Sequence, residues 1–406
     1  MRLLIYGLNH APEPTGIGKY TGELVAWLAA RGHDLRVIAA PPYYPDWRIA
    51  ADHSAWLWQR ERRDGALVLR SPLYVPRQPR GATRLVHLAS FAATSLPVAL
   101  FEAVAWRPQL VFTVAPALAS APGALLAARL CGAKAWLHIQ DFEVDAAFSL
   151  GLLSGGGWQR AVLGGEAALL RRFDRVSTIA EAMVERLAAK GVPSDRRSLF
   201  RNWVDCQAIR PLDGASKLRA ELGLDGTTVA LYAGAMGEKQ GVETLIELAG
   251  PLAAAGVALV LAGAGAARPR LEAALAGRPG VHLLPVQPAE RLNELLNLAD
   301  IHLLPQRADA ADLVMPSKLT GMLASGRPVV AGAAPGTELY RAIEGSGITV
   351  PPGDGAAMTD AVLALARDPQ RRLTLGAAAR ARALAEWDRD AILGAVERQM
   401  RVLVDA

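Results

Sequence analysis

Hydrophobic positions along the chain gather in short runs of three to six residues, separated by stretches in which apolar residues recur every three or four positions. Short apolar runs bounded by glycine and proline indicate buried strands, and the longer period indicates amphipathic helices. The first half has such runs at 3–6, 34–39, 67–70, 110–114, 135–139 and 175–178. The second half has them at 229–232, 258–261, 281–284, 301–304, 328–331 and 348–350. This alternation predicts two parallel sheets, each covered by helices on both faces.

Glycine-rich loops follow the first two apolar runs of the second half. The run at 229–232 leads into G-A-M-G-E-K-Q-G at 234–241, and the run at 258–261 leads into G-A-G at 263–265. Small residues there allow a ligand to approach the backbone, and ligands of open α/β sheets collect beyond the carboxyl ends of the strands. One such loop alone is ordinary turn chemistry. Two such loops after consecutive strands predict a phosphate-binding site at this edge of the sheet. The predicted contacts are Gly234, Gly241, Gly263 and Gly265, and Lys239 is the predicted cation.

A third segment combines a helix start, a positive charge and a buried strand, and it reads M-P-S-K-L-T-G-M-L-A-S-G-R-P-V-V-A at 315–331. Pro316 suits a first helical position, and Gly326 suits the left-handed residue that ends a helix. Unpaired N–H groups at a helix start attract anions. We therefore expect an anion to contact Pro316, Ser317, Lys318 and Leu319.

These three segments, in this order, resemble the donor-binding half of the retaining glycosyltransferases of family 4, which have the GT-B fold. The first half agrees, since P-T-G-I-G-K at 14–19 resembles the family's opening glycine loop and N-W-V-D at 202–205 resembles its domain junction. The resemblance implies an α/β architecture of two Rossmann-like domains whose parallel sheets face each other across a cleft. It places the acceptor-side domain at 1–208, the nucleotide-sugar-binding domain at 209–384, and a C-terminal helix that crosses back at 385–406.

Within the family, three segments are most similar to the fucosyltransferase type of colanic-acid and exopolysaccharide enzymes: Y-Y-P at 43–45, H-I-Q-D at 138–141 and the stretch 312–331. This finer resemblance implies transfer of L-fucose from GDP-fucose to a lipid-linked precursor, with retention of configuration and no cofactor. In the second domain it adds Gln287, near the base, and Asp312 to the donor contacts. In the first domain it implies donor contacts at Gly16 and Gly18, and an acceptor side formed by Asn9, His10 and Glu13.

A nucleotide sugar leaves a diphosphate whose negative charge grows as the glycosidic bond breaks, so its transfer needs cations beside that group. Lys239 lies in a G-x4-K-x-G pattern after a strand, which favours a phosphate contact over a solvated loop lysine. His138 and Asp141 follow a first-domain strand, where an imidazole can position a substrate and a carboxylate can ease deprotonation of the acceptor. Lys239, His138 and Asp141 are the catalytic candidates, although a structural histidine is the alternative at 138.

Two features of the sequence depart from the family pattern, and they involve three positions. Ala235 stands where the family has an arginine in the glycine loop, and Leu313 and Gly321 stand where it has two glutamates. Asp309 or Asp312 is then the candidate substitute for one glutamate. The departure leaves several functions open: a glycosyltransferase using GDP-fucose or a UDP-sugar, another GT-B enzyme such as an epimerase or a phosphorylase, and a noncatalytic nucleotide-sugar-binding subunit.

Composition and short motifs favour a cytoplasmic protein that requires no metal ion. At 406 residues, of which 51% are hydrophobic, the chain can bury two cores. Cys131 and Cys206 give neither a disulfide framework nor a metal-ligand spacing, and the N-terminus lacks the features of a signal peptide, so we expect a cytoplasmic protein. D-x-D occurs only at 388–390, where carboxylates favoured at a helix start explain it better than a metal site.

Positive charge is concentrated in the first half. Residues 1–208 carry 24 Lys and Arg against 17 Asp and Glu, and the remainder carries 20 against 22. Seven arginines between positions 60 and 84 precede the apolar stretch 85–106, whose only formal charge is Glu102. We interpret this stretch as a helix buried against the sheet, with peripheral contact to the cytoplasmic face of the inner membrane as the alternative and a transmembrane span as the least favoured. Nucleic acid is not an expected partner, because aromatic residues do not interleave with the arginines.

Overall fold

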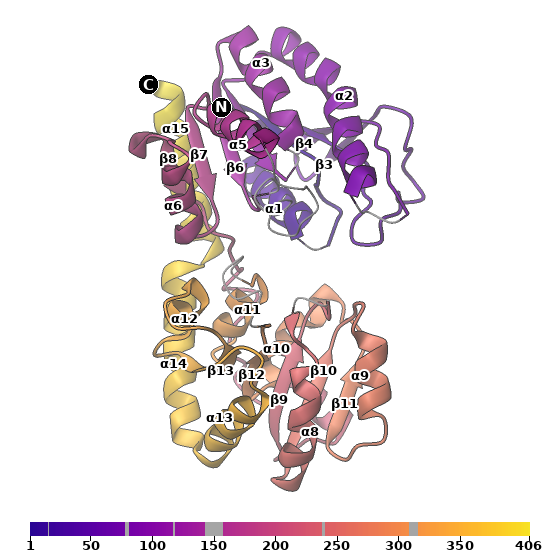
Figure 1. Cartoon of the computed structure of the whole chain (residues 1–406), viewed down its shortest axis with the longest axis vertical. Helices are drawn as coiled ribbons and strands as arrows, with labels where there is room; N and C mark the ends of the chain where they lie inside the picture. Colours follow the sequence, from indigo (N-terminus) through magenta and orange to yellow (C-terminus); the bar gives the residue numbers. More distant parts are fainter. Residues whose placement is uncertain (15, 78–80, 117, 143–156, 238–239, 308–315) are drawn as a thin grey trace. The chain divides into compact units, whose positions relative to one another are not determined.

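The computed structural model describes residues 1–14, 16–77, 81–116, 118–142, 157–237, 240–307 and 316–406. The chain divides into two compact units, one formed by Met1–Arg201 with Leu393–Ala406 and one formed by Asn202–Ile392. Each unit is a sheet covered by helices, as Figure 1 shows. The prediction of an α/β fold with two Rossmann-like sheets is confirmed.

The sheet of the first unit has the strand order β3-β4-β2-β1-β5-β6-β7-β8. Its strands are β1 (Arg2–Gly7), β2 (Asp34–Ala39), β3 (Gln59–Arg63), β4 (Ala66–Arg70), β5 (Leu110–Ala115), β6 (Lys134–Ile139), β7 (Arg175–Thr178) and β8 (Arg197–Leu199). Neighbouring strands run parallel except for β3 and β4. In register, Leu3 of β1 lies between Leu35 of β2 and Leu110 of β5. The strand order reverses beside β1, which places the loops after β1 and β5 where such sheets bind ligands.

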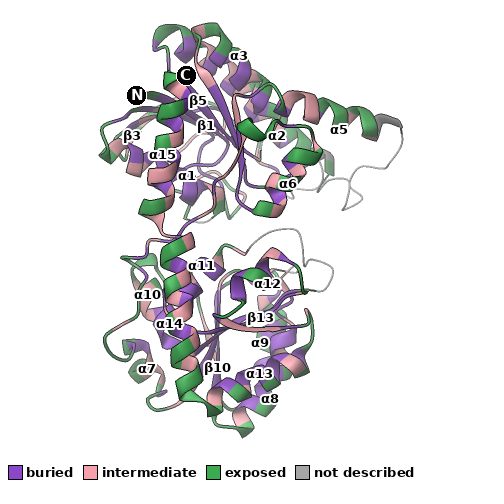
Figure 2. Cartoon of the chain, turned by 90° about the vertical axis from the view of Figure 1, so that its left-hand side faces the viewer, coloured by how far each residue is buried: buried purple, intermediate pink, exposed green. Residues whose placement is uncertain are grey.

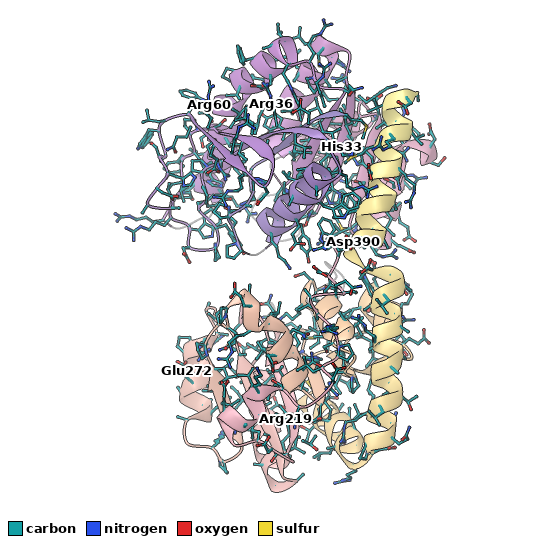
Figure 3. All side chains as sticks on the ribbon, turned by 180° about the vertical axis from the view of Figure 1, so that it is seen from behind. His33, Arg36, Arg60, Arg219, Glu272 and Asp390 are labelled. Carbon is teal, nitrogen blue, oxygen red and sulfur yellow. The ribbon has the colours of Figure 1, made fainter. Side chains whose placement is uncertain are left out.

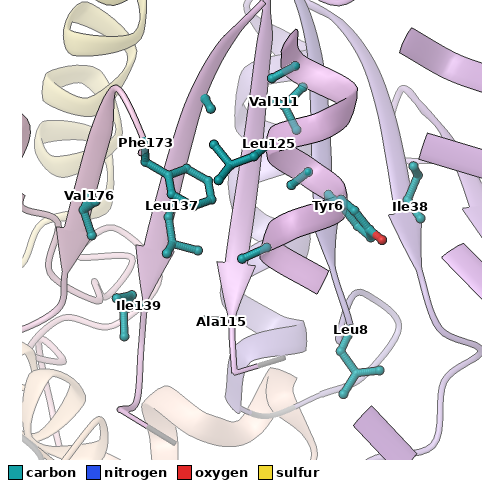
Figure 4. Close-up of a cluster of buried hydrophobic side chains, with 14 of the residues drawn as sticks. Tyr6, Leu8, Ile38, Val111, Ala115, Leu125, Leu137, Ile139, Phe173 and Val176 are labelled. Atoms are coloured by element: carbon teal, nitrogen blue, oxygen red, sulfur yellow. The ribbon is translucent and has the colours of Figure 1, made fainter. Parts of the chain in front are cut away.

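Helices cover this sheet and fill its core. They are α1 (Gly16–Ala30), α2 (Gly81–Ala105), α3 (Ala121–Cys131), α5 (Gly157–Leu170), α6 (Glu181–Ala189) and the end of α15 (Arg389–Asp405). Figure 4 shows part of one core, in which Tyr6, Leu137 and Val176 of the sheet pack with Leu125 of α3. The central strands β1, β2, β5, β6 and β7 are mostly buried on both faces, so their apolar runs were readable from the sequence.

The second unit has the strand order β11-β10-β9-β12-β13-β14, and all its strands are parallel. The strands are β9 (Thr228–Ala233), β10 (Val257–Ala262), β11 (Val281–Leu284), β12 (Ile301–Leu304), β13 (Val329–Gly332) and β14 (Gly347–Val350). Side chains of β9 alternate between two cores: Leu231 packs in one and Tyr232 in the other. The helices are α7 (Lys217–Leu222), α8 (Thr244–Ala254), α9 (Arg268–Leu275), α10 (Leu292–Leu298), α11 (Lys318–Ala324), α12 (Glu338–Ile343), α13 (Gly355–Arg367) and α14 (Pro369–Glu386).

Part of the arginine cluster between positions 60 and 84 forms a strand of the first unit. The charged segment Q-R-E-R-R forms β3, which pairs with β4 through a tight turn at Asp64 and Gly65, both with positive φ. Arg70, at the end of β4, is buried and donates to Glu61 Oε1 and to the carbonyl oxygen of Ala40, each at 2.9 Å. At least this arginine therefore stabilises the hairpin and cannot contribute to a surface patch.

The segment N-W-V-D belongs to the second unit, so the division of the chain falls at Arg201 and not at the expected 208. The N–H of Val204 donates to Trp387 O, and the N–H of Arg389 donates back to Val204 O, both at 2.9 Å. The Arg389 guanidinium also contacts Asp205 Oδ2 at 2.6 Å. The helix expected from 385 begins at Arg389, because residues 385 and 386 end α14.

The end of α15 is attached to the first unit by a buried carboxylate. Glu397 accepts hydrogen bonds from Arg31 Nε at 2.6 Å and from Arg401 Nη2 at 2.7 Å, and its Oε1 lies 2.9 Å from His33 Nε2. Figure 3 shows His33 beside this helix. Burial by itself would raise the pKa of Glu397, but the hydrogen bonds from Arg401, His33 and Arg31 outweigh it and lower the pKa to about 2. The ionised carboxylate therefore holds the helix end in place.

Candidate functional site

The two glycine loops of the second unit extend the sheet beyond the strand ends. The N–H of Gly234 donates to Ala262 O at 2.9 Å, and the N–H of Met236 donates to Ala264 O at 2.8 Å. A Cβ at Gly263 would lie 2.0 Å from Gly234 O, and one at Gly265 would lie 2.4 Å from Met236 O. Both glycines also have positive φ. Gly263 and Gly265 are therefore required by the close approach of two backbones, and their contact with a ligand stays a prediction.

A lysine ammonium lies directly behind the first of these loops. Lys318, the first residue of α11, donates from Nζ to the Tyr232 hydroxyl at 2.7 Å, and Nζ lies 4.3 Å from the centre of the Tyr232 ring. The Tyr232 hydroxyl in turn donates to Ala235 O. A Cβ at Gly234 would lie 3.3 Å from Lys318 Nζ, so glycine at this position leaves room for the ammonium.

This ammonium is charged but has no carboxylate partner among the described residues. Burial lowers the pKa of Lys318 to about 8, so the group is mostly protonated at neutral pH. Burial also raises the pKa of Tyr232, which keeps the hydroxyl neutral. A cation held by a neutral hydroxyl and a ring face retains its charge for an anionic ligand, because no counter-ion neutralises it.

The backbone around Lys318 differs from the predicted helix start. Helix α11 begins at Lys318, two residues after Pro316, and Ser317 at the N-cap makes no capping hydrogen bond. The N–H of Leu319 donates to Pro316 O at 3.0 Å, and the Leu319 side chain is fully buried. The Leu319 side chain therefore belongs to the core, and an anion contact at this helix start stays a prediction. The predicted helix end is confirmed, since Gly326 has φ +70°.

The remaining donor candidates of this unit are spread over several loops. A Cβ at Gly241 would lie 2.9 Å from the carbonyl carbon of Gln306, so this glycine allows two loops to pack. Gln287 is partly buried and donates from Nε2 to Pro285 O at 3.1 Å. Lys239 and Asp312 lie outside the described residues.

In the first unit, the acceptor-side candidates form an internal network around Glu13. This buried carboxylate accepts hydrogen bonds from Asn9 Nδ2 at 2.9 Å and from the N–H groups of Tyr43 and Tyr44 at 3.2 and 3.1 Å. Burial raises the pKa of Glu13, while these hydrogen bonds oppose the rise. A Cβ at Gly18 would lie 2.4 Å from Glu13 Oε2. Gly18 therefore makes room for the carboxylate, and its contact with the donor stays a prediction.

His10 differs from its neighbours because it is not satisfied internally. The imidazole is buried, and neither ring nitrogen has a hydrogen-bond partner among the described residues. Burial, followed by the charges of Arg70 and Arg63, lowers the pKa of His10 to about 3. The ring is therefore a neutral group with two free nitrogens. Of the three acceptor-side candidates, His10 is the one whose ring nitrogens have no hydrogen-bond partner among the described residues, and its contact with an acceptor stays a prediction.

The structure accounts for His138 as a packed residue of the sheet. Its Nδ1 lies 3.0 Å from Ser177 Oγ, and its ring lies 4.5 Å from Phe200 and stacks on Phe112 at 6.0 Å. Complete burial lowers the pKa of His138 to about 3, far below that of a base working near neutral pH. This packing favours the alternative of a structural histidine, and a catalytic role of His138 stays a prediction. Asp141 follows β6 and is exposed.

Two further candidates concern backbone and metal. Gly16 has φ +62° and begins α1, with Tyr44 Cε1 3.7 Å from the position of a Cβ. In the part of the chain that the structure describes, no three His, Cys, Asp or Glu residues are grouped as metal ligands. Asp388 of the D-x-D accepts from the N–H of Ala391 at 3.0 Å, as expected of a carboxylate at a helix start. Metal independence stays a prediction.

Sequence reasoning missed Tyr232, which positions the ammonium. Its only signal was an aromatic hydroxyl two residues before the glycine of a loop, and the residue was interpreted as part of a strand.

Comparison with protein families matches each unit to a separate glycosyltransferase domain. Residues 15–203 match the family described as "Glycosyl transferase 4-like domain", and residues 227–368 match "Glycosyl transferases group 1".

Two related sequences and two solved structures extend the likeness over most of the chain. WcaI of Escherichia coli (strain K12), named for colanic acid biosynthesis glycosyl transfer, is 43% identical over 85% of this chain and 86% of its own length. A GDP-mannose-dependent alpha-mannosyltransferase of Mycobacterium tuberculosis (strain CDC 1551 / Oshkosh) is 26% identical over 91% of this chain and 89% of its own. The sucrose-phosphate synthase of Thermosynechococcus elongatus superposes with a TM-score of 0.73 at 20% identity, covering 99% of this chain and 98% of the other. HepE of Anabaena, in complex with UDP and glucose, superposes with a TM-score of 0.70 at 16% identity, covering 99% of this chain and 100% of the other.

Proposed function

The chain belongs to the GT-B glycosyltransferases, and from this premise we propose that it moves L-fucose from GDP-fucose to a lipid-linked, colanic-acid-like exopolysaccharide precursor at the cytoplasmic face of the inner membrane. Two relatives support the finer part of the proposal. The name of WcaI, 43% identical, assigns it to colanic acid biosynthesis. The mycobacterial relative is named for a GDP-linked sugar donor.

The observation that carries the proposal is the Lys318 ammonium behind Gly234. A leaving diphosphate gains negative charge as the glycosidic bond breaks, and a cation that is already in place stabilises that charge without reorganisation. The family has an arginine at the position of Ala235, and Lys318 reaches the same loop through the hydroxyl of Tyr232. Lys318 thus supplies the cation that the substitution to alanine removed. Lys239 is the proposed second cation.

The proposed reaction retains the configuration of the sugar. The acceptor hydroxyl oxygen bonds to the anomeric carbon on the face that the diphosphate leaves, and the bond from that carbon to the diphosphate oxygen breaks. The hydroxyl proton passes to an oxygen of the departing diphosphate, so the reaction needs no general base from the protein. The pKa of His138, lowered to about 3 by burial, agrees with a mechanism that does not use it. No metal and no cofactor enter this scheme.

The experiment that tests the proposal combines donor binding with turnover. Thermal unfolding is measured with GDP, UDP, ADP and CMP and their sugar conjugates, since a ligand that binds the folded protein raises the unfolding temperature. We expect shifts with GDP and GDP-fucose, and release of GDP only when a lipid-linked acceptor fraction is added. A shift with UDP alone would overturn the donor. Binding without turnover in any acceptor fraction would overturn the enzymatic function and favour a noncatalytic subunit.

A further inference from the structure

From Val86 to Val104 the outward face of helix α2 is apolar. The exposed positions in this stretch follow one another at intervals of three or four residues, and they are Val86, Ala89, Ala93, Pro97, Phe101 and Val104. Phe101 and Val104 are 65% and 63% exposed. The opposite face is buried in the first unit through Phe91 and Ala99. The interpretation of this stretch as a buried helix therefore holds for one face only, and Figure 2 marks exposed segments along α2.

Helix α3 widens this face. The two helices touch, since a Cβ at Gly123 of α3 would lie 3.0 Å from Leu96 Cδ1 of α2. Leu126 and Leu130 of α3 are 51% and 55% exposed. Trp58, which precedes β3, also contacts α2: its exposed indole donates to Thr94 O at 3.0 Å. Contiguous exposed apolar surface of this kind indicates an interaction site, and indole rings favour the boundary between water and lipid.

The exposed charged residues of α2 and α3, and the residue Arg107 that follows α2, are all positive. Arg84 near the start of α2, Arg107 just after its end and Arg129 on α3 are exposed. The single carboxylate of the two helices, Glu102, is buried and paired with Arg36. A surface that is apolar in the middle and cationic at its edge complements an anionic bilayer, whose headgroups attract arginine while the acyl region receives the apolar side chains.

We propose that the face formed by α2 and α3 docks on an anionic lipid bilayer, with α2 lying along the surface and its apolar residues at the boundary of headgroups and acyl chains. Helix α2 is one candidate by length and hydropathy for crossing a membrane, over Thr83–Ala105. A crossing would remove Phe91 and Ala99 from the core and would carry Glu102, with its partner Arg36, into hydrocarbon. A second copy of the chain is a poorer occupant, because it would bring two cationic edges together.

The test is sedimentation of the full chain with vesicles, without nucleotide and without acceptor. Vesicles of phosphatidylcholine containing phosphatidylglycerol are compared with vesicles of phosphatidylcholine alone, at low and high salt. We expect binding to the anionic vesicles that weakens with salt, and a loss of at least tenfold for the double variant Phe101→Glu, Val104→Glu. Arg129→Gln should weaken binding a few-fold, and only at low salt.

The matched control is Val402→Glu, which introduces one glutamate, where the double variant introduces two, on an exposed valine of α15 in the same unit. It should bind vesicles as the unaltered chain does. All variants should keep the unfolding temperature and its shift with nucleotide, which separates docking from folding and from the proposed donor site. Equal vesicle binding by the double variant would overturn the inference. So would a concentration-dependent dimer that the double variant abolishes, because that result identifies a second copy as the occupant.

Discussion

Both units place glycines in the segment that follows their central strand, β1 or β9, but the charged group behind the glycines differs. In the first unit, Gly18 makes room for the buried carboxylate of Glu13, which is 2.4 Å from the position of a Cβ. In the second unit, Gly234 makes room for the ammonium of Lys318, at 3.3 Å. A carboxylate repels phosphate and an ammonium attracts it. Similar glycine-containing segments in the two units therefore lie beside groups of opposite charge. From this comparison we expect the diphosphate to bind to the second unit.

Of the changes that test this comparison, removal of the Lys318 ammonium should have the largest effect on turnover. Lys318→Met keeps the length and the apolar stem of the side chain but removes its charge. Loss of one such charge-stabilising group lowers kcat by about 10²–10³-fold, and we expect a loss of that size here. Turnover of the nucleotide sugar and the affinity for GDP are measured alongside Lys217→Met, which alters an exposed lysine at the start of α7. Turnover within threefold of the unaltered enzyme would remove Lys318 from the mechanism.

A substitution at Gly18 should lower the stability of the first unit and leave the affinity for the donor unchanged. Gly18→Ala presses a methyl group against Glu13, and overpacking of this kind costs about 1–3 kcal/mol. Gly164→Ala is the control, because a Cβ there meets no atom within 4 Å and alanine favours a helix interior. We expect denaturant unfolding to show a less stable first unit for Gly18→Ala alone. A weaker GDP affinity in this variant, at unchanged stability, would contradict the assignment of Gly18 to packing.

The sheets of the two units and the difference between their glycine segments could be predicted from the sequence only in part. Twelve strands were predicted because buried parallel strands form unbroken apolar runs. Strand β3 was missed because its residues are charged and half-exposed, although Asp64-Gly65 was an available hairpin signal. Lys318 was named from its place at a helix start, while its contact with Tyr232 depends on how α11 meets the end of β9. The burial of Glu13 behind Gly18 likewise depends on loop geometry that has no sequence period.

The pH dependence of donor binding should distinguish the two units further. Burial lowers the pKa of Lys318 to about 8, so the ammonium loses its proton as the pH rises through 8. The affinity for GDP should therefore fall about tenfold between pH 7 and pH 9, because about nine-tenths of the lysine is neutral at the higher value. Lys318→Arg keeps its charge throughout this range and should flatten the profile. Isothermal titration calorimetry at fixed ionic strength measures both. A profile of unaltered steepness in Lys318→Arg would assign the titration to another group.

The smallest effect should come from Tyr232, which acts through Lys318. Tyr232→Phe keeps the ring 4.3 Å beneath the ammonium but removes the hydroxyl that accepts from Nζ at 2.7 Å and donates to Ala235 O. One hydrogen bond contributes about 0.5–1.5 kcal/mol, so GDP affinity should fall by roughly two- to tenfold. In the Lys318→Met background the same substitution should change affinity little, because the hydroxyl has no ammonium left to position. A purely structural tyrosine would give equal losses in both backgrounds, and calorimetry with GDP and with guanosine shows whether the loss requires the phosphates.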